Sequence, residues 1–173
     1  MPASKPRRLI AAAAAAVLAA GLASCGGGGG TGTTTSTDAA LSKAELIAKG
    51  DAICKEARDR FAELQGSVPT TPQEAATFTQ RLIEITRSEI DQLRALQAPA
   101  SLQPALKRYL AAMDENVAVM KQVLDAAKRN DLHAYLVARA KTAQDQVKRL
   151  QLAQAVGFKE CSVPAGTATG NSG

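Results

Sequence analysis

Residues 101–136, SLQPALKRYLAAMDENVAVMKQVLDAAKRNDLHAYL, decide the fold of this chain. Asn130 suits the left-handed end of a helix, and Asp131 can cap the helix that follows. Because only these two residues separate two helical patterns, the sequence predicts an antiparallel helical hairpin. In the first helix of this hairpin, apolar side chains recur every three or four residues, which is the spacing of one helical face. They are Leu102, Leu106, Tyr109, Leu110, Met113, Val117, Met120 and Leu124.

The helix after Asp131 is expected to end at Gly157, where a left-handed residue can stop it. Its predicted inward stripe also follows spacings of three and four residues. The stripe consists of Leu132, Leu136, Ala140, Ala143, Val147 and Leu150.

Two further amphipathic helices are predicted before the hairpin. The first opens with the capping box Ser42-Lys43-Ala44-Glu45 and stops near Gly66. The second opens with Thr71-Pro72-Gln73-Glu74 and ends before Pro99. Their apolar stripes are Leu46, Gly50, Ile53, Ala57, Phe61 and Leu64 in the first helix, and Phe78, Leu82, Ile83, Ile85, Ile90, Leu93 and Leu96 in the second.

No segment shows the period-two alternation of β-branched residues that is typical of strands. The predicted fold class is therefore all-α, with an up-down-up-down four-helix bundle over residues 41–161. Three long helices with the second docked across them form the alternative.

The N-terminus has the pattern of an export signal. Cationic side chains precede an uncharged run over residues 9–22, which is shorter than the roughly 20 residues of a membrane span. The run ends in Leu22-Ala23-Ser24-Cys25, which resembles a bacterial lipobox. The resemblance implies cleavage between Ser24 and Cys25, removal of residues 1–24, and a diacylglyceryl group on Cys25. It also implies anchoring at the outer face of a bacterial cell membrane.

The remaining ends are predicted to be unstructured. Residues 25–40 begin with the lipidated cysteine and continue in Gly and Thr, the composition of a flexible tether. Residues 162–173 are rich in small polar residues and are expected to be a disordered tail.

Composition excludes several functional classes. The 173-residue chain has one His, five aromatic residues and no Trp, which leaves no His-based metal cluster and no aromatic platform for bases. Three of the 21 Lys and Arg lie in the signal segment, so the remaining 18 face 16 acids and the net charge falls from +5 to +2. Nucleic-acid binding is therefore not expected.

The two other cysteines, Cys54 and Cys161, form an even number in an exported protein, and a four-helix bundle brings the tail back to the first helix. We therefore expect one structural disulfide between them. Gly50 lies one turn before Cys54 and would let the tail approach closely. A redox pair or thiolate metal site would need a CxxC motif or further ligands, which the sequence lacks.

A family resemblance involves the same segments. Gly50-Asp51-Ala52-Ile53-Cys54 and Gly157-Phe158-Lys159-Glu160-Cys161 resemble segments of small actinobacterial lipoproteins, which carry a membrane-anchored cysteine and a helical domain. The resemblance implies location and fold, and it supplies no catalytic residue because the family has no assigned activity.

Few side chains are candidates for a site. Glu89 lies within an apolar stripe, and Arg139 is its candidate partner in a buried ion pair. His133 and the pair Lys148-Arg149 are expected on solvated surfaces. Asp114 and Glu115 point about 100° apart and do not form an acid–base pair. The two helix-three methionines, Met113 and Met120, are expected to fill the core.

The sequence therefore favours a non-enzymatic, lipid-anchored binding or scaffolding module without cofactor or metal, whose envelope partner is not specified. A carrier with a cavity near Ala140 and Ala143 is one alternative. An enzyme whose site combines Glu89, Arg139 or His133 is the other.

Overall fold

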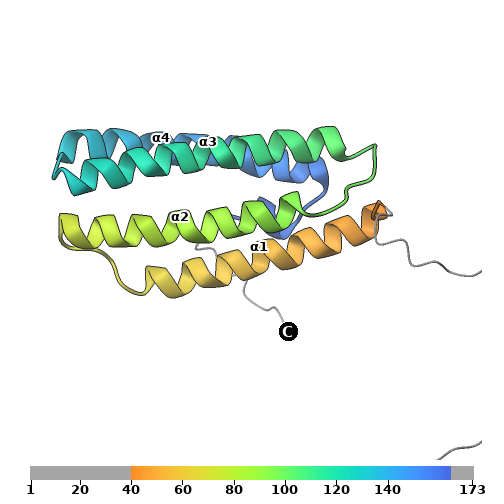
Figure 1. Ribbon diagram of the computed structural model, residues 1–173, viewed down its shortest axis with the longest axis horizontal. Helices are drawn as coiled ribbons and strands as arrows, with labels where there is room; N and C mark the ends of the chain where they lie inside the picture. Colours follow the sequence, from red (N-terminus) through yellow and green to blue (C-terminus); the bar gives the residue numbers. More distant parts are fainter. Residues whose placement is uncertain (1–39, 165–173) are drawn as a thin grey trace, which may run out of the picture. The chain divides into compact units, whose positions relative to one another are not determined.

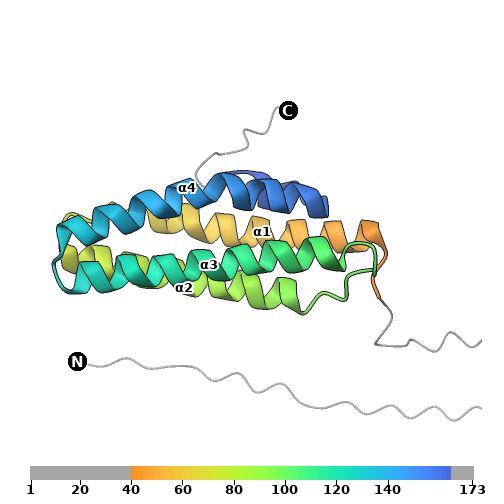
Figure 2. The same cartoon turned by 90° about the horizontal axis from the view of Figure 1, so that it is seen from above.

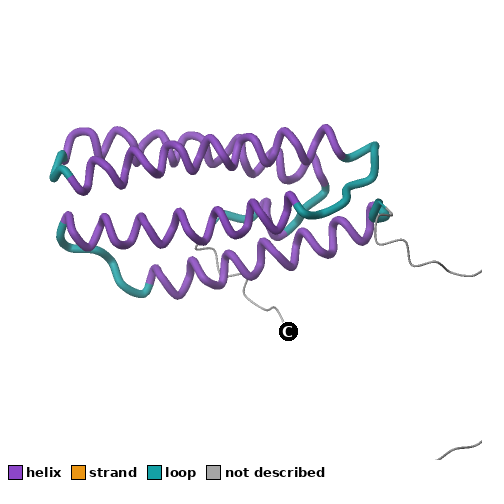
Figure 3. The backbone as a smooth tube through the Cα atoms, viewed as in Figure 1, coloured by secondary structure: helices purple, strands orange, loops and turns teal. Residues whose placement is uncertain are grey.

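The computed structural model describes residues 40–164, and these form an all-α bundle (Figure 1). The helices are α1 (Lys43–Gln65), α2 (Pro72–Arg94), α3 (Gln103–Lys128) and α4 (Leu132–Val156), followed by the short 3₁₀ helix η1 (Glu160–Ser162). The described part contains no strand, which confirms the predicted fold class (Figure 3). The predicted signal segment, the lipidation at Cys25, and most of the tether and tail lie outside the described residues.

Side-chain hydrogen bonds begin α1, α2 and α4 where the sequence predicts, whereas α2 ends at Arg94, earlier than the expected end just before Pro99. At α1, Glu45 N donates to Ser42 Oγ (3.2 Å) and Ser42 N donates to the Glu45 carboxylate (2.9 Å). Thr71 and Glu74 form the same reciprocal box at α2. Asp131 accepts from Ala134 N at the start of α4 (2.9 Å). These side chains satisfy backbone N–H groups that have no partner inside their own helix.

The two residues that were predicted to adopt the left-handed backbone conformation do so. Gly157 ends α4 with φ +102°, and Asn130 adopts φ +54° between α3 and α4. Asn is one of the few residues that tolerates this conformation. The hairpin connection has three residues, 129–131, one more than the sequence predicts, because α3 ends at Lys128.

The helices pack in chain order, as an up-down-up-down bundle. α1 packs against α2, α2 against α3 and α3 against α4, while η1 contacts both α1 and α4. In Figures 1 and 2, α3 and α4 lie side by side in one layer, over a second layer of α1 and α2. Within the described residues α1 and α4 make little direct contact, so α4 has only one helix as an extensive packing partner.

The core contains most of the predicted stripes of the first three helices. Leu46, Leu93, Val156 and Phe158 are the largest fully buried side chains. The described residues 40–164 belong to one compact unit. That unit includes every core residue and both cysteines of the disulfide. The whole described core and its disulfide therefore lie within this unit.

The predicted inward face of α4 is wrong. Leu132, Leu136 and Val147 are 57–68% exposed. Ala140 and Ala143 are exposed as well, and Leu150 is only half-buried. The buried side chains of α4 are instead Ala138, Ala153 and Val156. Small residues let α4 approach α3 closely, and no second helix covers the larger side chains on its other side.

Candidate functional site

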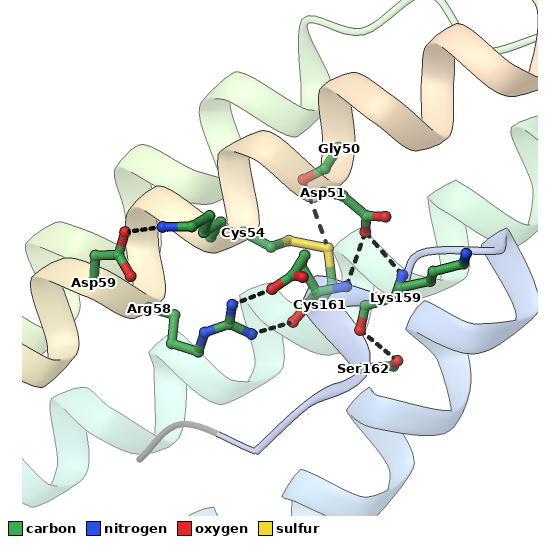
Figure 4. Close-up of polar contacts among 10 residues, drawn as sticks. Gly50, Asp51, Cys54, Arg58, Asp59, Lys159, Cys161 and Ser162 are labelled. Carbon is green, nitrogen blue, oxygen red and sulfur yellow. Dashed lines mark hydrogen bonds and ion pairs between the residues drawn. A yellow bond between two sulfur atoms is a disulfide. The ribbon is translucent and has the colours of Figure 1, made fainter. Parts of the chain in front are cut away.

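The tail after α4 is joined to α1 by the predicted disulfide. Cys54 and Cys161 are bonded with their Cα atoms 5.1 Å apart, although 107 positions separate them in sequence (Figure 4). This confirms the pairing. The bond links the two sides of the bundle at α1 and α4, which make little direct contact with each other.

Gly50 accommodates the ring of Phe158, which follows Gly157. A Cβ at position 50 would lie 2.6 Å from Phe158 Cζ, closer than side-chain packing permits. Phe158 is 1% exposed and meets Tyr109 of α3 edge to face, with centroids 6.1 Å apart. The tail therefore contributes core, and Gly50 has the role that the sequence predicts for it.

We call the contacts that α1 residues 50–58 make with tail residues 157–161 the clasp. Asp51 and Arg58 contribute its polar contacts. Asp51 Oδ1 accepts from the backbone N–H groups of Lys159 (2.8 Å) and Glu160 (3.0 Å). Arg58 pairs with the carboxylate of Glu160 and donates to its carbonyl oxygen (3.3 Å). Figure 4 shows both α1 side chains directed toward the tail on either side of the disulfide.

Sequence reasoning missed the roles of Asp51 and Arg58. The sequence spacing could have revealed these roles, because Asp51, Cys54 and Arg58 are three and four residues apart and share one face of α1. The segments 50–54 and 157–161 are thus explained as a structural clasp.

A second group of side chains lies inside the bundle. Glu89 of α2 is 7% exposed and Tyr109 of α3 is 2% exposed. Arg149 of α4 is half-buried, and its Nη1 has no hydrogen-bond partner within the described residues. We call Glu89, Tyr109 and Arg149 the polar centre.

Electrostatics in the polar centre follow from desolvation. Burial raises the pKa of Glu89 to about 7, and the Arg149 cation partly opposes that shift. Burial and the nearby Glu89 carboxylate raise the pKa of Tyr109. Burial lowers the pKa of Arg149, against the attraction of Tyr109, Asp145 and Glu89. Each shift favours the neutral form of its group.

The expected buried ion pair between Glu89 and Arg139 does not form. Arg139 is exposed, donates to Tyr135 Oη (3.2 Å) and lies 5.8 Å from the centre of that ring. Arg149, expected on a solvated face, is the cation that acts on Glu89. Compared with the predicted orientation, α4 is rotated about its own axis, so position 149 faces inward and position 139 faces outward.

The remaining candidates lie apart from both groups. His133 is exposed, as expected. Asp114 pairs with Arg94 of α2 (3.0 Å), whereas Glu115 pairs with Lys148 of α4 (3.4 Å), so the two acids point to different helices. Met113 and Met120 are core residues. Among residues 40–164 no three His, Cys, Asp or Glu side chains gather as metal ligands would.

A shallow depression of about 230 Å³ lies at the end of the bundle where the α1–α2 and α3–α4 connections meet. Pro69, Pro72, Ala126 and Tyr135 are among its lining residues, and exposed Leu132 forms part of its edge. Ala140 and Ala143, proposed as the lining of a carrier cavity, are on the surface of α4 instead.

Most of the exposed large apolar side chains of residues 40–164 lie on α4. Of the five exposed large apolar side chains in the described part, four belong to α4 and the fifth is Val68. We define the α4 stripe as Leu132, Leu136, Ala140, Ala143 and Val147. These residues follow helical spacing and form one continuous face.

No protein-family model, curated protein or solved structure matches this chain. None of the helices within residues 40–164 has the length and hydropathy that crossing a bilayer requires.

Proposed function

We propose that this protein is a non-enzymatic binding or scaffolding module of the bacterial cell envelope. In this proposal a diacylglyceryl group on Cys25 holds it at the outer face of the membrane, as in the small actinobacterial lipoproteins that the sequence resembles. The bundle presents the α4 stripe as its contact surface.

The observation that carries the binding role is the exposure of the α4 stripe. Leu132 is 68% exposed and Val147 is 60% exposed, on a helix whose opposite side is packed against α3. Contiguous exposed apolar side chains on a folded domain are typical of an interaction site. The clasp of Cys54, Cys161 and Phe158 supports the same role, because it holds α4 in one position relative to α1.

The lipobox pattern supports the proposed lipid anchor, and the disulfide supports the export that it requires. Disulfides persist in proteins outside the reducing cytosol, so the Cys54–Cys161 bond agrees with export. The exported domain would then be held near the membrane through the chain that precedes Leu41.

Labelling with a fatty-acid analogue in bacterial cells tests the anchor. The wild-type chain should incorporate label and Cys25→Ser should not, because only the Cys25 thiol can receive the diacylglyceryl group. Cys54→Ser is the matched control and should retain the label. Label that persists in Cys25→Ser would contradict the proposed anchor.

Photocrosslinking in the same cells tests the contact surface. A photoreactive residue at position 147 should form a protein adduct, and the same residue at position 68 should not. Val68 is the control because it is also apolar and 80% exposed, but it lies in the α1–α2 connection. Absence of any adduct from position 147 would contradict the binding role of α4.

A further inference from the structure

Two buried polar atoms inside the bundle have no hydrogen-bond partner among residues 40–164. One is an acceptor, Oδ1 of Asn116 on α3, and the other is a donor, Nη1 of Arg149 on α4. Asn116 is 7% exposed, and its Nδ2 donates to Sδ of Met120 (3.3 Å). Buried polar atoms in folded proteins are almost always hydrogen-bonded, so this complementary pair needs an explanation.

Asn116 and Arg149 lie at the same height along the bundle. The residues immediately before them, Glu115 and Lys148, are joined by an ion pair (3.4 Å). Asn116 also shares a face of α3 with Tyr109, which lies about two helical turns earlier. Arg149 is close enough to Tyr109 to act on its hydroxyl group. Arg149 therefore lies against the face of α3 to which Asn116 belongs.

Glu89 of α2 lies at this height as well. Ile90 and Val117, the residues after Glu89 and Asn116, line one depression between α2 and α3. Glu89 and Asn116 are each only 7% exposed, so both face the core beside that depression. The Arg149 cation also acts on the Glu89 carboxyl group. Three polar side chains from three helices thus meet in the interior.

The rest of the described chain offers these atoms little. The buried residues of α1 are Leu46, Gly50, Cys54 and Ala57, and the sulfur of Cys54 is held in the disulfide. Asp145, the other carboxylate that acts on Arg149, pairs with Lys141 (2.9 Å). A partner for both unbonded atoms is therefore to be sought outside the chain.

The chemistry of the three groups selects a molecule that both donates and accepts hydrogen bonds. The Arg149 cation disfavours a metal ion, while Oδ1 of Asn116 and the carboxyl group of Glu89 disfavour an anion. A water molecule can accept from a guanidinium, donate to an amide oxygen and still bond a carboxyl group. Buried waters typically make about three hydrogen bonds to such groups.

We propose that Glu89, Asn116 and Arg149 enclose an internal water molecule, which accepts from Nη1 of Arg149 and donates to Oδ1 of Asn116, with the Glu89 carboxyl group as its third partner. This hydration site goes beyond the proposed function and does not depend on it.

The site gives a physical reason for the orientation of α4. If Arg149 turned outward, Oδ1 of Asn116 would stay buried without the water that Arg149 holds. A buried polar atom without a hydrogen bond is costly, so the site favours the orientation in which Arg149 faces inward. In that orientation the α4 stripe is exposed.

Nuclear magnetic resonance tests the water directly, on isotope-labelled protein purified in the form in which bacteria accumulate it. The side-chain amide of Asn116 should show a nuclear Overhauser effect to water with the sign of an immobilised proton pair. Asn130 is the control, because it is exposed and should meet only fast-exchanging solvent. Arg149→Met removes the donor and should abolish the effect at Asn116. An Asn116 amide without an immobilised water in the wild type would overturn the proposal.

A double-mutant cycle tests whether the two side chains share one site. Asn116→Leu and Arg149→Met should each lower the urea midpoint, because each leaves a buried partner without its hydrogen bond. The double variant should lose less than the sum of the two, since neither orphaned atom remains. Arg139→Met is the control, because Arg139 is an exposed cation on the same helix, and its effect should add to that of Asn116→Leu. Additive losses for Asn116→Leu and Arg149→Met would overturn the shared site.

A high-resolution crystal structure separates the water from a direct contact. Electron density for one water within hydrogen-bond distance of Asn116 Oδ1 and Arg149 Nη1 would support the proposal. A direct bond between these two atoms, with no water beside them, would explain the coupling in the cycle and overturn the hydration site. None of these outcomes depends on the lipid at Cys25 or on a partner of the α4 stripe.

Discussion

The buried carboxyl group of Glu89 should make the stability of the bundle depend on pH. Burial raises its pKa from 4.5 to about 7 in the folded protein, and the carboxyl regains its ordinary pKa on unfolding. Between these two values the folded chain holds a proton that the unfolded chain has lost. The free energy of unfolding should therefore be greatest below pH 4.5 and should fall as the pH rises through about 7.

The magnitude follows from the two pKa values. They differ by about 2.5 units, and each unit corresponds to about 1.36 kcal/mol, so the wild-type protein should lose about 3 kcal/mol of unfolding free energy across this range. Glu89→Gln keeps the size of the side chain and removes its titration. The unfolding free energy of the variant should not show this decline, because glutamine does not titrate. Loss of the attraction to Arg149 changes its stability by the same amount at each pH.

Urea denaturation of residues 36–173 from pH 5 to pH 8 measures the decline. This window lies above the range in which Glu45, Glu74 and Asp145, whose pKa values are lowered by their hydrogen bonds, would withdraw stability as the pH falls. Glu84→Gln is the control, because Glu84 lies on the same helix and is exposed. Parallel curves for the wild type and Glu89→Gln would refute the reasoning.

Three further predictions concern the clasp and one cap. Cys54→Ser should lower the free energy of unfolding by about 2–5 kcal/mol while the far-ultraviolet circular dichroism stays helical at low temperature, and an unchanged denaturant midpoint would contradict a stabilising disulfide. Gly50→Ala should cost about 1–3 kcal/mol, because its Cβ would overlap the ring of Phe158. Gly66→Ala, where the nearest atom is 3.4 Å away, is its control and should not share that loss in thermal denaturation. Thr71→Ala should lower stability by about 1 kcal/mol through loss of the α2 cap, and a midpoint equal to that of the wild type would argue against the cap.

Local chemistry made the helix boundaries predictable. The capping boxes at Ser42 and Thr71 act within four consecutive residues, so the pattern alone locates the start of each helix. The disulfide was also predictable, because two cysteines remain after Cys25 is assigned to lipid and a bundle brings the tail back to the first helix. Asp51 and Arg58 were accessible to the same reasoning, since they share the face of Cys54.

The sequence by itself determined the all-α class, the hairpin at Asn130 and the pairing of Cys54 with Cys161, because caps, turns and cysteine count act through neighbouring residues or through topology. Only the tertiary structure decided which side of α4 faces the core. Periodicity reports that α4 has an apolar stripe, but it does not report whether a second helix is present to cover that stripe. Since α1 makes little direct contact with α4, α4 buries alanines and Arg149 against α3 and leaves Leu136 and Val147 exposed.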